Sequence, residues 1–106
     1  MKRNLILIIA GILSCQVLYG QPSFSERRER DKSLNEGITY ISEGQYELAA
    51  VSFTHCLDLD STYAPAWLLR GRIFIEWGVM ENALEEINMA LHYNSALAEA
   101  YFYKGY

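Results

Sequence analysis

Residues 67–91 read WLLRGRIFIEWGVMENALEEINMAL, and residues 33–57 read SLNEGITYISEGQYELAAVSFTHCL. A shift of 34 residues aligns these two stretches. The longer segments that contain them, residues 33–66 and 67–100, share ten identical positions. These are Leu34/Leu68, Gly37/Gly71, Ile41/Ile75, Gly44/Gly78, Glu47/Glu81, Ala49/Ala83, Leu57/Leu91, Ser61/Ser95, Ala64/Ala98 and Ala66/Ala100. A third copy starts at residues 101–106, where Gly105 keeps the glycine register. A fixed period of this length predicts a repeat array.

Each copy has the pattern of two amphipathic helices. In the second copy, apolar residues recur at three- and four-residue steps from Trp67 to Ile75, Gly78 interrupts the helix, and the same steps resume from Met80 to Leu91. Within each pair, Gly71 and Ala83 (or Gly37 and Ala49) are predicted where the antiparallel helices approach closely. A glycine inside a helix costs about 1 kcal/mol relative to alanine, so its recurrence indicates tight packing. Trp67 and Phe74 are expected to fill the remaining space.

Residues 21–32 are predicted to form a linker and a helical extension ahead of the first repeat. Ser23 and Glu26 have the three-residue spacing of a capping box, which starts a helix near Phe24 or Ser25. Charges of mixed sign in residues 26–32 indicate a solvated helical face.

The first twenty residues are typical of an export signal. Lys2 and Arg3 precede an apolar run over residues 5–18, which is shorter than the roughly 20 residues that span a bilayer. Cleavage after Gly20 would leave a chain that starts at Gln21. Two alternatives remain: lipidation of Cys15 in the sequence Leu13-Ser14-Cys15, or an uncut membrane anchor over residues 5–18. We expect an exported protein, most simply in the bacterial periplasm.

Composition argues against several classes of function. The whole chain has nine basic and thirteen acidic residues, and removal of the leader makes it more acidic, which disfavours nucleic acid as a partner. Cys56 would then be the one thiol left, expected as a small buried hydrophobe. His55 and His92 do not converge with enough other ligands for a metal site. No catalytic motif is present, so we expect no enzyme, cofactor or metal.

The period and the small residues resemble the tetratricopeptide repeat family. The second copy matches its signature with Trp67, Gly71, Phe74, Ala83, Ile87 and Ala90, and the first copy with Gly37, Tyr40, Ala49, Phe53 and Cys56. Arg70 and Glu36 stand where the family has Leu, and Ser95 and Ser61 where it has Pro. The resemblance implies an all-α fold in which antiparallel helical hairpins stack as a short right-handed solenoid.

The resemblance also implies a concave groove lined by the first helix of each hairpin. Matched position by position, the groove residues are Leu34, Ile38, Ile41, Leu68, Arg72, Ile75, Glu76, Phe102 and Tyr106. Some relatives clamp a C-terminal carboxylate there with Lys and Asn, but Leu34 and Ile38 occupy those two places. A protein segment with hydrophobic anchors is therefore the expected partner, although some of these residues could simply pack against neighbouring hairpins.

The resulting expectation is a non-enzymatic scaffold of the bacterial envelope that binds a protein or peptide. Contact with the membrane is expected only through an uncleaved leader or a lipid on Cys15. Tyr101, Tyr103 and Tyr106 crowd an open third copy, so assembly of the chain with itself through them is an alternative. A further alternative is that the chain is a fragment of a larger repeat protein.

Overall fold

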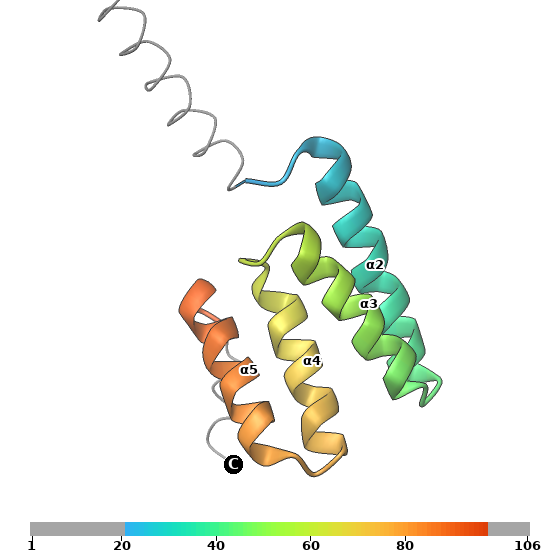
Figure 1. Cartoon of the computed structure of the whole chain (residues 1–106), viewed down its shortest axis with the longest axis vertical. Helices are drawn as coiled ribbons and strands as arrows, with labels where there is room; N and C mark the ends of the chain where they lie inside the picture. Colours follow the sequence, from blue (N-terminus) through green and yellow to red (C-terminus); the bar gives the residue numbers. More distant parts are fainter. Residues whose placement is uncertain (1–20, 98–106) are drawn as a thin grey trace, which may run out of the picture.

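Four helices connected by short turns make up the part of the chain that the computed structural model describes, residues 21–97. They are α2 (Phe24–Ser42), α3 (Tyr46–Leu59), α4 (Ala64–Glu76) and α5 (Met80–Tyr93), which follow one another across the molecule in Figure 1. Residues 21–97 contain no strand, and the prediction of an all-α fold is confirmed. The predicted leader and the start of the third copy lie outside the described residues.

The first helix begins where the sequence predicts. The Ser23 hydroxyl accepts a hydrogen bond from the Glu26 backbone N–H at 3.2 Å, and the Glu26 carboxylate accepts one from the Ser23 N–H at 3.1 Å. This reciprocal capping box satisfies two backbone donors that the first helical turn leaves free. The helix continues without a break through the predicted extension into the first repeat.

A glycine reverses the chain within each hairpin. Gly44, between α2 and α3, has φ of 74°, and Gly78, between α4 and α5, has φ of 77°. Only glycine adopts this left-handed backbone without strain. The turns pack α2 against α3 and α4 against α5, while α3 packs against α4 and joins the two hairpins.

The two helical glycines lie where the helices of each hairpin press together. A Cβ atom added to Gly37 would come within 2.5 Å of the Phe53 ring, and one added to Gly71 within 3.1 Å of Glu86 Cβ and 3.4 Å of the Ala83 carbonyl oxygen. The predicted close approach of Gly71 and Ala83 is therefore confirmed. At Gly37 the nearest group is the Phe53 ring instead of Ala49, because that ring lies directly over the glycine.

The core consists of two linked clusters. The first joins α3 to α4 and contains the fully buried residues Ala49, Phe53, Cys56 and Ala66, with Ile73 at 1% exposure. The second lies inside the other hairpin and contains Leu68, Ile87 and Ala90. Trp67 packs against both clusters and donates its indole N–H to the Ser61 carbonyl at 2.8 Å. Its predicted space-filling role is confirmed, and the space that it fills lies between the hairpins.

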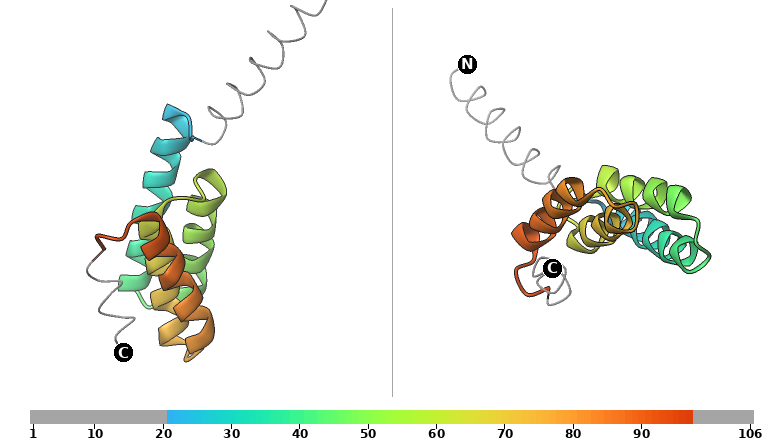
Figure 2. Two further views of the ribbon diagram at one scale, coloured as in Figure 1. Left: turned by 90° about the vertical axis from the view of Figure 1, so that its left-hand side faces the viewer. Right: turned by 90° about the horizontal axis from the view of Figure 1, so that it is seen from below.

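The hairpins stack so that α2 and α4 lie on the same side of α3, as the two views in Figure 2 show. The first helices of successive hairpins therefore share one face of the molecule. This is the arrangement that a groove built from first helices requires. None of the helices in residues 21–97 is long and apolar enough to cross a bilayer.

Candidate functional site

The predicted groove residues on α2 differ in how much surface they expose. Leu34 and Ile41 are partly buried and pack against the first core cluster. Ile38, between them, is 45% exposed. The predicted groove residues of α2 thus form an apolar strip in which Ile38 is the exposed side chain.

On α4 the predicted set divides into core and surface. Leu68 is only 4% exposed and packs with Ile87 and Ala90, so it lies inside the second cluster and offers almost no surface to a partner. Ile75 packs against the same cluster from a partly buried position. Arg72 and Glu76 are exposed, and neither forms an ion pair within residues 21–97. Phe102 and Tyr106 lie outside the described residues.

The structure therefore places one apolar and one basic side chain at equivalent points of successive hairpins. Ile38 and Arg72 are 34 residues apart and occupy the same register position on α2 and α4. Both side chains are exposed. Such a pair provides a hydrophobic contact next to a charged hydrogen-bond donor, which suits a peptide better than a small reactive substrate.

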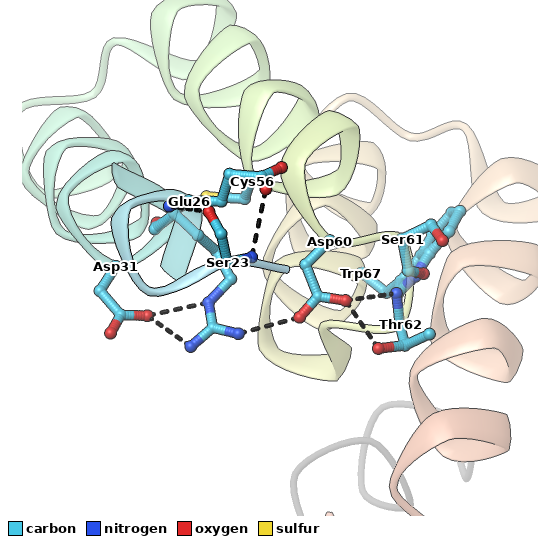
Figure 3. Close-up of polar contacts among 9 residues, drawn as sticks. Ser23, Glu26, Asp31, Cys56, Asp60, Ser61, Thr62 and Trp67 are labelled. Carbon is cyan, nitrogen blue, oxygen red and sulfur yellow. Dashed lines mark hydrogen bonds and ion pairs between the residues drawn. The ribbon is translucent and has the colours of Figure 1, made fainter. Parts of the chain in front are cut away.

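A polar junction, which could not be predicted from the sequence pattern, connects the first half of α2 to the end of α3. The Arg30 guanidinium lies between Asp31 and Asp60, 2.9 Å from a carboxylate oxygen of each; Figure 3 labels the two aspartates. The guanidinium also lies 4.0 Å from the centroid of the Tyr63 ring. Asp60 also accepts hydrogen bonds from the Thr62 backbone N–H and hydroxyl. The side chains of Arg30 and Asp60 are only 15% and 7% exposed. Arg30 is thus an exception to the predicted solvated face.

The charges at this junction shift its pKa values in a consistent way. Burial alone would raise the pKa of Asp60, but hydrogen bonds from Thr62 and Arg30 outweigh it and lower that pKa. Burial alone would lower the pKa of Arg30, but the hydrogen bonds to Asp31 and Asp60 outweigh it and raise that pKa. Both shifts favour the charged forms, so the junction is an intact ion pair at neutral pH.

The Cys56 thiol lies at the same junction. It is fully buried and donates to the Arg30 carbonyl at 3.2 Å. Burial raises the pKa of this thiol to about 11. The expected small buried hydrophobe is confirmed, because a thiol with this pKa is not a nucleophile at neutral pH.

A second ion pair joins α4 to α5, and its arginine also contacts α3 of the first hairpin. Arg70 contacts the Glu86 carboxylate at 2.8 Å and the Thr54 hydroxyl at 3.1 Å, and its guanidinium lies 5.0 Å from the Trp67 ring centroid. Arg70 replaces the leucine of the resembled signature, and Glu86 compensates its charge. An arginine at a position that is usually apolar suggests a buried ion pair, but the sequence does not indicate that Glu86 is the partner of Arg70.

The histidines take no part in a ligand cluster within the described residues. His55 contacts Glu29 at 3.0 Å on the surface, and the His92 ring packs edge-on against Tyr93. No group of three or more potential metal ligands occurs among residues 21–97.

Comparison with known proteins agrees with the geometry. The tetratricopeptide repeat family matches residues 34–63, and no curated protein matches the sequence. Among solved structures, one similar chain is the second tetratricopeptide domain of Spaghetti (RPAP3) bound to the HSP90 peptide SRMEEVD. It aligns with a TM-score of 0.71 and 18% identity over 76% of this chain and 77% of that chain.

Stacked antiparallel hairpins with glycine and alanine at their contacts define a helical repeat protein. The family match assigns residues 34–63, the first hairpin, to the tetratricopeptide repeat, and the solved structure has the same fold over both hairpins.

Proposed function

We propose that the chain is a non-enzymatic adaptor of the bacterial cell envelope that binds a segment of another protein in the groove formed by α2 and α4. The observation that carries the proposal is the exposure of Ile38 and Arg72 at equivalent positions of the two hairpins. The solved relative supports it, since a domain of the same fold holds a short peptide.

The groove chemistry favours a partner that differs from the peptide in that relative. Leu34 and Ile38 stand at places where carboxylate-clamping members carry Lys and Asn, so they cannot donate hydrogen bonds to a chain terminus. Arg72 can pair with one carboxylate, and the apolar strip can accept branched or aromatic side chains. We therefore propose an internal segment with hydrophobic anchors and an acidic residue.

Affinity capture from bacterial envelope extracts tests the proposal when it is run with matched variants. Ile38→Asp and Arg72→Glu change exposed groove side chains, whereas Val51→Asp changes a side chain that is 67% exposed on α3. Under the proposal, the same retained protein is lost with both groove variants and kept with Val51→Asp. Equal capture by all three variants would refute a groove-binding role. Leu68 is unsuitable for this test because its replacement would damage the core.

The envelope location is proposed from the leader and is tested separately. Fractionation followed by mass determination of the mature N-terminus distinguishes three outcomes. A chain beginning at Gln21 supports a free exported protein, a lipid on Cys15 an anchored one, and an intact Met1 in the membrane fraction an uncut anchor. Recovery of the intact chain in the cytoplasm would contradict export.

A further inference from the structure

The turns of the two hairpins have the same backbone but different side chains. The central glycine has φ of 74° in the first turn and 77° in the second. The 34-residue shift places Glu43 and Gln45 of the first turn on Trp77 and Val79 of the second. Because the first turn closes with polar residues, the turn geometry does not require apolar ones. The apolar side chains of the second turn therefore need another explanation.

The second turn presents these apolar side chains to solvent. Trp77, Val79 and Met80 are 43%, 41% and 54% exposed. The Trp77 ring packs edge-on against the Phe74 ring, with the centroids 5.9 Å apart, and this contact holds the indole at the turn. Clustered exposed apolar side chains are typical of surfaces that contact another molecule. Trp77, Val79 and Met80 are called the apolar turn below.

Acidic residues border the apolar turn. Glu76 precedes Trp77 and Glu81 follows Met80, and both glutamates are exposed. Residues 73–97 contain no lysine or arginine. Carboxylates at this place oppose insertion into a bilayer, because a charged group is costly there and anionic lipids repel it. The charge therefore favours a partner surface that is both apolar and basic.

The opposite end of this chain carries a surface of that kind. Phe24, at the start of α2, is 70% exposed, and the Arg28 guanidinium lies 6.0 Å from its ring centroid. Arg27 is exposed beside them, and neither arginine forms an ion pair within residues 21–97. Phe24, Arg27 and Arg28 are called the basic end. The start of α2 and the α4–α5 turn lie at opposite ends of the molecule (Figure 1), so the two surfaces cannot meet within one chain.

The carboxylates nearest to the basic end already have partners. Glu26 accepts a hydrogen bond from the Ser23 backbone N–H at 3.1 Å in the capping box. Glu29 contacts the His55 ring at 3.0 Å. The two arginines are thus the charged side chains of this end that a second molecule can pair with.

We propose that one copy of this chain seats its apolar turn on the basic end of a second copy. Trp77 then packs on Phe24, and the Glu81 carboxylate accepts hydrogen bonds from the Arg28 guanidinium. Because the two surfaces differ and lie at opposite ends, the contact is heterologous and extends the assembly head to tail. The contact uses none of the residues of the proposed peptide groove.

Disulfide capture between two full-length chains tests the contact. Every chain carries Cys15→Ser and keeps the buried Cys56. One chain carries Ser25→Cys and the other Val79→Cys, with tags of different mass. Under oxidised glutathione this pair should join at least about tenfold faster than Val51→Cys with Val79→Cys, because docking raises the effective concentration. Val51 is 67% exposed on α3 and belongs to neither surface, so it is the matched control.

Charge reversal gives an independent measurement of the same contact. Arg28→Glu in the Ser25→Cys chain should slow capture at least about fivefold, since two carboxylates then face each other. Glu81→Lys in the Val79→Cys chain should restore the rate by reversing the pair. Lys32→Glu is the control, because it changes net charge equally at an exposed site outside the basic end, and we expect a change below about twofold.

Three results would overturn the proposal. The first is an equal capture rate for the Ser25→Cys and Val51→Cys chains. The second is a loss in Arg28→Glu that Glu81→Lys does not restore. The third is protection of Val79→Cys, but not of Val51→Cys, from maleimide by phosphatidylcholine vesicles without faster capture between chains, which would assign the apolar turn to a membrane surface.

Discussion

The two helical glycines are predicted to differ in their tolerance of alanine. In Gly37→Ala the new Cβ meets the fully buried Phe53 ring at 2.5 Å, and the ring or the helix must move. Overpacking of this kind costs about 1–3 kcal/mol, against a gain in helix propensity of about 1 kcal/mol. In Gly71→Ala the closest contact of the new Cβ is Glu86 Cβ at 3.1 Å. The cost of overpacking and the gain in helix propensity should therefore nearly cancel. Urea unfolding of both variants should show Gly37→Ala as the less stable, and the reverse order would contradict the packing described.

Asp60→Asn tests the junction between α2 and α3. The hydrogen bonds from Thr62 and Arg30 outweigh burial and lower the pKa of Asp60 in the folded chain. The charged carboxylate therefore stabilises the fold at pH above the unfolded-state pKa of about 4. This stabilisation is lost as the pH falls through the lower pKa of the folded state. At pH 7 the variant should lose about 1.5–3 kcal/mol, the usual range for a hydrogen bond to a charged group. The difference from the unmodified chain should shrink below about pH 4. A pH-independent difference in unfolding free energy would contradict this account.

At the scale of elements, the Arg70–Glu86 pair is a polar link between α4 and α5, the two helices of the second hairpin. Glu86 Oε2 and Arg70 Nε are buried without a hydrogen-bond partner among residues 21–97. Arg70→Leu introduces the leucine of the resembled signature but leaves the Glu86 carboxylate without its positive partner. Removing one member of a fully buried ion pair costs roughly 3–5 kcal/mol of folding stability. With side chains still 19% and 13% exposed, we expect about 2–3 kcal/mol.

The double variant Arg70→Leu with Glu86→Leu is the control for that prediction. Replacing both members of a buried pair by apolar side chains is often neutral or stabilising. Thermal unfolding should therefore recover most of the loss seen in the single variant. A double variant as unstable as the single one would show that the pair contributes by its shape and not by its charge.

The elements could be predicted from sequence because their signals are local or periodic. The capping box at Ser23, the turn glycine at Gly78 and the close approach at Gly71 all follow from spacing along the chain. Arg30 was missed because the sign alternation of one helix says nothing about Asp60, which is thirty residues away. Leu68 was assigned to the groove by register alone, and register does not determine how deeply α5 covers α4. Sequence thus predicted that the first helices of the hairpins share a face, but not which of their side chains are exposed on it.

At the scale of the whole molecule, the proposed groove should distinguish between classes of peptide. Because Leu34 and Ile38 supply no hydrogen-bond donor for a chain terminus, we expect the peptide SRMEEVD to bind at least about tenfold more weakly to this chain than to the RPAP3 domain, a loss of about 1.4 kcal/mol. Calorimetric titration of both proteins under one buffer condition checks this. Leu34→Lys with Ile38→Asn should raise the affinity, since the lysine stem can keep its apolar contacts while its ammonium reaches solvent. Tight binding to the unmodified chain would contradict the proposed specificity.

The Cys56 thiol is buried where α3 packs against α2, so its reactivity can report how often these two helices separate. With a pKa of about 11 for Cys56, only about one molecule in ten thousand carries a thiolate at pH 7, and the folded chain shields even that fraction from reagents. Once Cys15 is replaced by Ser, alkylation by iodoacetamide should therefore record how often α2 separates from α3, and partner binding should slow it. Rapid labelling of the folded chain would show that the first hairpin opens far more readily than its packing implies.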